Sequence, residues 1–155
     1  TLHTNDAPTT IPRLIDMGIE PFLIASTVNV VIAQRLVRKI CVRCRESFKV
    51  EREELTVSYP LDIVQKISSG SDSVRLYRGK GCDVCNGTGF KGRIGIYEIM
   101  LIDAEIRTLI LQRASADVIR KAVQDRKGKS MFDDGIVKAL QGITTLHDVL
   151  RVIRS

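Results

Sequence analysis

Two cysteine pairs, Cys41-Val42-Arg43-Cys44 and Cys82-Asp83-Val84-Cys85, contain all four cysteines of the 155-residue chain. A C-x-x-C pair places two thiolates on one turn, and a tetrahedral zinc ion needs two such pairs that approach from different directions. The spacing therefore predicts one structural zinc site, whose ligands are Cys41, Cys44, Cys82 and Cys85. Two disulfides and four unliganded thiols remain as alternatives, although no sign of an oxidising compartment supports the disulfides.

Glycines are concentrated around the second cysteine pair. They are Gly79, Gly81, Gly87, Gly89 and Gly92. Residues without a Cβ allow tight turns, so this stretch predicts a knuckle whose backbone amides turn toward the cysteine sulfurs. A small, loop-rich module has little apolar surface to bury, and we expect the metal to hold it together.

The composition is that of a globular protein, with 44% hydrophobic residues and a formal charge of +6. A signal peptide and an apolar run of about 18–20 residues are both missing, so we expect a cytosolic chain. Because the sequence starts at Thr1 without a Met, this expectation covers the given sequence alone. Zinc-bound thiolates lower the charge to about +4. With 5% aromatic residues and no Trp, base-stacking platforms are scarce, and we expect no nucleic-acid partner.

The first two thirds of the chain divide into two segments. Residues 1–40 show two helical patterns, the second of which extends through Ile32 and gives way to a strand over residues 36–40. Residues 41–91 hold the cysteines, with a polar loop at 68–73 and a short strand after it. The first segment therefore favours a mixed α/β arrangement, and the second a metal module.

Residues 92–155 form a third segment. A returning strand is predicted around residues 94–99, and apolar residues then fall at helical spacing in four successive stretches. Four residues that are competent N-caps precede these stretches: Asp103, Ser115, Ser130 and Thr145. We expect a small helical bundle whose apolar stripes form its core.

Nucleotide-binding motifs are scarce in this chain. Lys127-Gly128-Lys129-Ser130 ends like a phosphate-binding loop, but Val123 stands where that loop needs glycine. His3 is the more informative residue, because it follows an apolar residue and precedes a run of small polar ones. Such a run is typical of a buried strand that enters a loop, where α/β folds place ligand contacts. His147 is expected to be exposed.

Several motifs, in one order along the chain, resemble the secretion ATPases that drive type II secretion and type IV pilus assembly. They are Thr1-Leu2-His3-Thr4-Asn5-Asp6-Ala7-Pro8, Ile11-Pro12-Arg13-Leu14, Met17-Gly18, Ala33-Gln34-Arg35-Leu36-Val37-Arg38, both cysteine pairs, Gly92-Arg93-Ile94-Gly95-Ile96-Tyr97-Glu98, Asp133-Asp134-Gly135 and Thr145-Leu146-His147-Asp148-Val149-Leu150. The resemblance covers nearly the whole chain. The tetracysteine element is similar to that of the secretion and pilus-extension branch, since the pilus-retraction branch lacks it.

The resemblance implies a domain order. Residues 1–40 would end a RecA-like P-loop ATPase core, residues 41–91 would form the tetracysteine zinc module, and residues 92–155 would supply a return strand and a C-terminal helical subdomain.

The resemblance also implies roles for individual residues. In this family the residue at His3 belongs to a histidine box and approaches the terminal phosphate of ATP. Support of the nucleotide site or of a subunit interface is implied for Thr4, Asn5, Asp6, Arg35 and Arg38. Capping of the following helix is the alternative for the first three, and a surface ion pair is the alternative for the arginines.

A longer parent protein is implied as well. Full-length members carry a docking domain, a Walker A loop, an acidic box and a Walker B strand before the position of Thr1, and these supply the phosphate cradle and the Mg²⁺ ligands. The parent is expected to be a cytoplasmic homo-hexamer that hydrolyses ATP. Platform proteins of the inner membrane are expected to bind it there. The chain alone is expected to be inactive, and the choice between secretion and pilus assembly stays open.

Two other classes compete with this interpretation. A free-standing zinc ribbon that binds nucleic acid is supported by the basic cluster beside Cys41 and Cys44. The stretch from Cys82 to Gly89 also fits the C-x-x-C-x-G-x-G repeat of J-domain chaperones. Those chaperones use four such repeats, whereas this chain has one.

Overall fold

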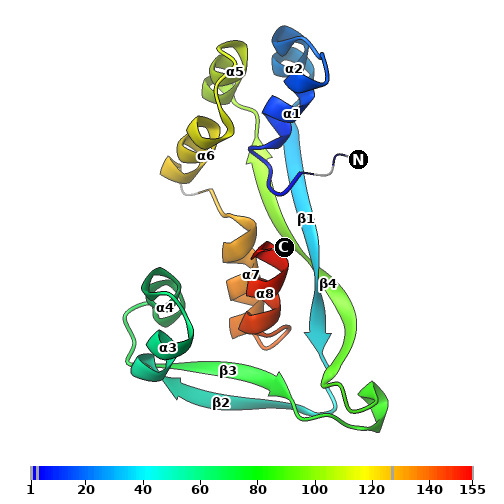
Figure 1. Ribbon diagram of the computed structural model, residues 1–155, viewed down its shortest axis with the longest axis vertical. Helices are drawn as coiled ribbons and strands as arrows, with labels where there is room; N and C mark the ends of the chain where they lie inside the picture. Colours follow the sequence, from blue (N-terminus) through cyan, green and yellow to red (C-terminus); the bar gives the residue numbers. More distant parts are fainter. Residues whose placement is uncertain (1, 3, 127, 155) are drawn as a thin grey trace. The chain divides into compact units, whose positions relative to one another are not determined.

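The computed structural model describes residues 2, 4–126 and 128–154, which fall into two compact units. Unit 1 comprises residues 1–35 and 96–134, and unit 2 comprises residues 36–95 and 135–155. Strands β1 (Val30–Ile40) and β4 (Phe90–Leu101) pair in a two-stranded sheet (Figure 1). Each of these two strands has residues in both units.

Strand β1 begins earlier than the sequence pattern predicted. The expected helix through Ile32 is wrong, because α2 (Pro21–Thr27) ends at Thr27 and the strand starts at Val30. Except for Asn29, residues 27–32 at this boundary are β-branched, and such side chains prefer extended backbone. Within β1 the buried residues Ala33 and Val37 lie four apart on one face, as the two-residue period of a strand requires.

Helices that the structure describes in unit 1 pack against one another in pairs. Helix α2 contacts α5 (Ala104–Leu111), and α1 (Thr10–Asp16) contacts α6 (Ala116–Asp125). The core of this unit is aliphatic and includes Ile11, Ile24, Ile96, Met100, Ile106, Ile110 and Ile119. These side chains hold the segment after His3 against the later part of the unit.

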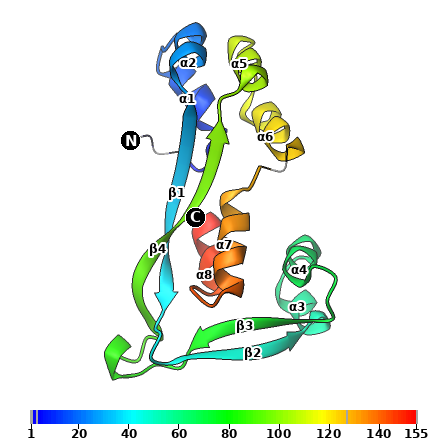
Figure 2. The ribbon, with the colours of Figure 1, turned by 180° about the vertical axis from the view of Figure 1, so that it is seen from behind.

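Unit 2 contains a second antiparallel pair, β2 (Arg45–Glu51) and β3 (Ser73–Gly79), in which Phe48 lies opposite Leu76. Helices α3 (Arg52–Ser58) and α4 (Leu61–Ser68) connect the two strands (Figure 2). The strand predicted after the polar loop is confirmed, and the loop is shorter than the predicted 68–73, because Ser68 ends α4 and Ser73 begins β3. Strand β2 and both connecting helices were not predicted.

The four predicted helix starts are confirmed. Asp103 and Ser115 cap α5 and α6 by accepting hydrogen bonds from Ile106 N (3.1 Å) and Val118 N (3.5 Å). Helix α7 (Met131–Leu140) follows Ser130, and α8 (Leu146–Arg154) follows Thr145. The predicted C-terminal helical bundle stays a prediction, because α5 and α6 belong to unit 1 whereas α8 belongs to unit 2. None of the described helices is long and apolar enough to cross a membrane.

Candidate functional site

The four cysteine side chains converge within unit 2. All four Sγ atoms lie within 4.8 Å of one another. The separations are 3.9 Å for Cys41–Cys82, 3.8 Å for Cys44–Cys85 and 3.7 Å for Cys82–Cys85. Four sulfurs about 2.3 Å from a central zinc at tetrahedral angles stand about 3.8 Å apart. The cluster therefore fits one zinc ion. All four cysteines are free, so the disulfide alternative is wrong.

Backbone amides turn toward this cluster, as predicted. Cys85 Sγ accepts hydrogen bonds from Cys82 N at 3.2 Å and from Gly89 N at 3.3 Å. Burial of Cys85 raises its pKa, but hydrogen bonds from these amides and from the Cys82 and Cys44 thiols outweigh burial and lower the pKa of Cys85 to about 6. Burial and the neighbouring thiols raise the pKa of Cys44 to about 11. Four thiolates at this spacing would repel one another, and a bound cation would neutralise their charge.

Glycine is required where the two cysteine loops meet. Gly89 has a φ of +75°, and a Cβ on it would lie 2.6 Å from Gly79 O. Gly89 O in turn accepts the amide of Cys41 at 2.9 Å, which ties the second loop to the first. Because four cysteines fill a tetrahedral shell, a zinc ion there would keep no open position for a catalytic water.

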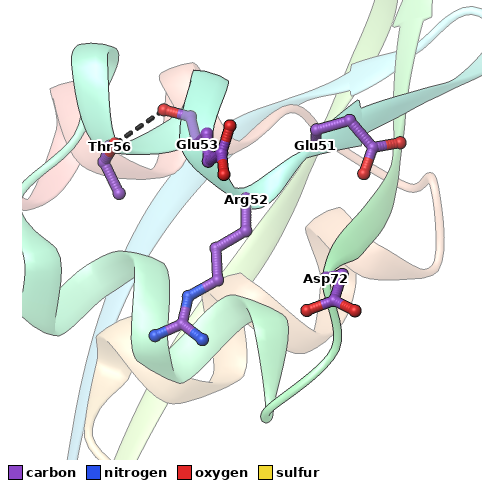
Figure 3. A pocket seen from close by; sticks show the side chains of 5 residues that line it. All are labelled: Glu51, Arg52, Glu53, Thr56 and Asp72. Atoms are coloured by element: carbon purple, nitrogen blue, oxygen red, sulfur yellow. Dashed lines mark hydrogen bonds between the residues drawn. The ribbon is translucent and has the colours of Figure 1, made fainter.

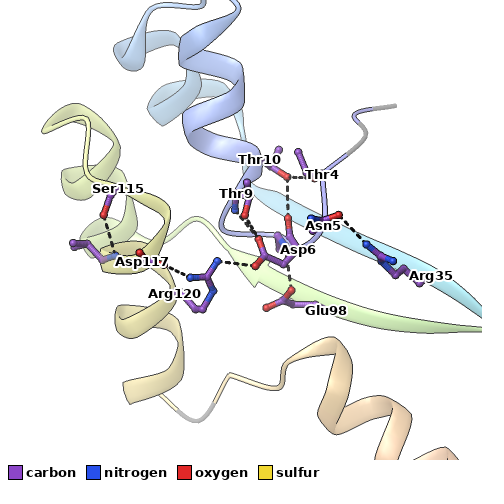
Figure 4. A network of polar contacts seen from close by, with 12 residues as sticks. Thr4, Asn5, Asp6, Thr9, Thr10, Arg35, Glu98, Ser115, Asp117 and Arg120 are labelled. Atoms are coloured by element: carbon purple, nitrogen blue, oxygen red, sulfur yellow. Dashed lines mark hydrogen bonds and ion pairs between the residues drawn. The ribbon is translucent and has the colours of Figure 1, made fainter. Parts of the chain in front are cut away.

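The polar segment at the start of the chain is described from Thr4 onward, and His3 lies outside the described residues. Each of the next three residues has a partner within unit 1 (Figure 4). The Thr4 and Thr10 hydroxyls lie 3.0 Å apart, Asn5 Oδ1 accepts from Arg35 at 2.8 Å, and Asp6 Oδ1 accepts from Thr9 N at 2.9 Å. Asp6 thus stabilises the turn that leads into α1. The assigned roles of these residues stay predictions.

Two residues that the sequence did not assign hold the same segment. Arg120 donates to Asp6 Oδ2 at 2.8 Å, and Glu98 accepts the buried amide of Ala7 at 3.1 Å. Burial raises the pKa of Glu98, and the Ala7 hydrogen bond acts against that rise. The sequence gives one indication that Glu98 is buried, because it alternates with the apolar residues Ile96 and Met100. The structure places all three on the buried face of β4.

The two candidate arginines have different partners. Arg35 bonds to Asn5 in unit 1, whereas Arg38 belongs to unit 2 and reaches the fully buried Asp148. Arg38 Nε lies 2.9 Å from Asp148 Oδ1, and its guanidinium carbon lies 4.1 Å from the Phe90 ring centroid. Burial would raise the pKa of Asp148, but hydrogen bonds from Arg38 and Arg151 outweigh it and lower that pKa. The structure thus gives Arg38 an ion-pair partner, and its nucleotide-sensing role stays a prediction.

A hollow at the end of β2 carries acidic side chains (Figure 3). Glu51, Arg52, Glu53, Thr56 and Asp72 line it, and Thr56 Oγ1 donates to the Glu53 carbonyl at 2.6 Å. Its three carboxylates belong to exposed residues. We assign no ligand to this hollow, because solvated acidic groups need none.

Comparison with known proteins gives one consistent result. The family model described as "Type II/IV secretion system protein" matches residues 1–151. A type IV pilus assembly ATPase from Thermus thermophilus is 44% identical over 97% of this chain and 16% of its own length. A type II secretion system ATPase from Vibrio cholerae is 41% identical over 99% of this chain and 29% of its own length.

A type IV pilus assembly ATPase from Acinetobacter baylyi is 38% identical over 99% of this chain and 25% of its own length. The chain thus spans less than a third of each of these relatives. The match extends over nearly the whole chain, from the segment that contains His3 through both cysteine pairs to α8. The chain therefore belongs to the type II/IV secretion system protein family.

Proposed function

We propose that this chain is the C-terminal portion of a cytoplasmic, hexameric ATPase that powers type II protein secretion or type IV pilus assembly. The family match over residues 1–151 carries this proposal. The named relatives are ATPases of these two systems, and each aligns with nearly all of this chain. ATP and Mg²⁺ would be the substrate and cofactor of the full-length protein, and inner-membrane platform proteins would be its partners.

Within that ATPase, this chain would supply the histidine box. A histidine beside the terminal phosphate can stabilise the negative charge that develops during phosphoryl transfer. Asn5 and Arg35, which are hydrogen-bonded to each other, would support the same region. The phosphate cradle, the Mg²⁺ ligands and the general base would come from the part of the protein that precedes Thr1.

The cysteine cluster would have a structural role. A zinc ion would cross-link the end of β1 to the loop between β3 and β4, with four ligands: Cys41, Cys44, Cys82 and Cys85. This role is supported by the Sγ separations of 3.7–3.9 Å and by the two amides directed at Cys85 Sγ. The nucleic-acid alternative receives no comparable support from the described residues.

The purified 155-residue chain is expected to release no phosphate from ATP in the presence of Mg²⁺, because phosphoryl transfer needs a phosphate cradle and a metal site together. A coupled phosphate-release assay checks this expectation, with the full-length protein as the active reference. Mg²⁺-dependent phosphate release by the chain alone would show that these residues suffice for hydrolysis and would refute this expectation.

A further inference from the structure

We propose that Glu98 and Arg120 are positioning residues that fix the turn after His3 and so set where His3 meets the nucleotide. This proposal rests on the proposed function of His3. Both residues lie in unit 1, the compact unit that also contains the segment from Thr4 to Thr10. Neither residue would need to touch ATP, since each would act through the backbone or the side chain of the histidine box.

The first anchor is the hydrogen bond from Ala7 N to Glu98 Oε2, at 3.1 Å. Ala7 is fully buried and Glu98 is 7% exposed, so water cannot replace either partner easily. A buried amide left without an acceptor is costly, which favours conformations of the turn that keep this bond. The two residues are 91 positions apart in the sequence, so β4 fixes the turn from a distant part of the chain.

The second anchor is the ion pair between Arg120 and Asp6, at 2.8 Å. The two carboxylate oxygens of Asp6 have separate tasks, because Oδ1 accepts from Thr9 N while Oδ2 accepts from Arg120. One oxygen therefore shapes the local turn, and the other ties that turn to α6 (Figure 4). Arg120 is itself held by Asp117, one helical turn earlier.

The anchors act on adjacent residues close to His3. Three residue steps separate His3 from Asp6, and such a stretch spans at most about 11 Å when fully extended. The contact between the Thr4 and Thr10 hydroxyls restricts that stretch further. Fixing Asp6 and Ala7 therefore restricts the described segment from Thr4 to Ala7, which directly follows His3 in the sequence. A catalytic group displaced by about 1 Å can lose on the order of 100-fold in rate.

The test compares ATP turnover by variants of the full-length protein. Arg120→Ala and Glu98→Ala are expected to lower kcat by about 10- to 100-fold while KM changes little, since the loss concerns the transition state. Glu98→Gln should recover most of the activity, because its amide oxygen can still accept the Ala7 hydrogen bond. Lys121→Ala is the matched control, as Lys121 is the exposed neighbour of Arg120 on α6.

A double variant separates positioning from general stability. Adding Arg120→Ala to His3→Ala should cause no further loss, because Arg120 acts through His3. Three results would each overturn the proposal. The first is additive losses in the double variant, and the second is a kcat of Arg120→Ala equal to that of Lys121→Ala. The third is a Glu98→Gln variant that is as impaired as Glu98→Ala. If His3→Ala has full activity, the proposed function fails instead, and the positioning role fails with it.

Amide exchange gives a reading that does not depend on turnover. In the full-length protein, exchange at residues 4–10 should accelerate in Arg120→Ala and Glu98→Ala but not in Lys121→Ala. Unchanged exchange in both variants would refute the anchoring itself, even if His3→Ala is inactive. The inference is supported at each step if exchange accelerates in Arg120→Ala and Glu98→Ala, if both variants show the expected loss in kcat, and if His3→Ala is inactive.

Discussion

Replacing Cys85 by serine is expected to abolish stoichiometric zinc binding and to unfold the cysteine module. Cys85 is buried and its sulfur accepts hydrogen bonds from two backbone amides, so its replacement removes a ligand that the surrounding backbone holds in place. Changes to groups outside the ligand shell alone weaken metal binding by about 10- to 100-fold, and loss of a ligand should exceed that. Zinc content by elemental analysis and amide exchange over residues 41–91 measure both effects.

Val84→Ser is the matched control for this experiment. Val84 lies in the same knuckle, is 42% exposed and provides no ligand atom, so the variant should retain one zinc per chain. Unit 1 has its own aliphatic core, and exchange in α2 and α5 should stay unchanged in both variants. Full zinc occupancy and unchanged exchange in Cys85→Ser would contradict a four-thiolate site.

Replacing His3 by alanine in the full-length protein should lower kcat for ATP hydrolysis by about 100- to 1,000-fold. This is the size of effect seen when one donor that stabilises transition-state charge is removed. KM should change less than kcat, because the contact strengthens as charge develops on the transferred phosphoryl group. Steady-state phosphate release, measured at saturating and limiting ATP, separates the two parameters.

His147→Ala provides the control, because His147 is exposed on α8 and carries no assigned role. Its kcat should equal that of the unaltered protein. Equal activity of the His3 and His147 variants would remove the histidine box from the proposed mechanism. It would leave the family assignment intact, since that assignment rests on the match over residues 1–151.

The features that could be predicted from the sequence are determined by residues only a few positions apart in the chain. A C-x-x-C pair needs one turn to bring its thiolates together, and Asp103 caps α5 through the amide three residues later. The exposed apolar residues near Ile32 were harder to interpret, because short apolar runs fit both helix and strand. Strand β2 was missed because its residues are half exposed, and pairing with β3 decides its conformation.

The site residues that the sequence missed depend on distant partners. Glu98 meets Ala7 across 91 positions, and Arg120 meets Asp6 across 114. Local spacing carries no information about such contacts. An acidic residue among the buried residues of β4 was a usable signal, whereas an arginine on the exposed helix pattern of α6 was not. The fold brings these groups together, and the sequence alone could not show which partner either residue meets.

X-ray absorption at the zinc edge of the purified chain tests the central claim that the cysteine cluster is a closed structural site. We predict four sulfur scatterers about 2.3 Å from a single zinc, with no nitrogen or oxygen in the first shell. That result would leave the metal without a position for water or substrate and place the chemistry elsewhere in the protein. A first shell with an oxygen ligand and fewer than four sulfurs would contradict the claim.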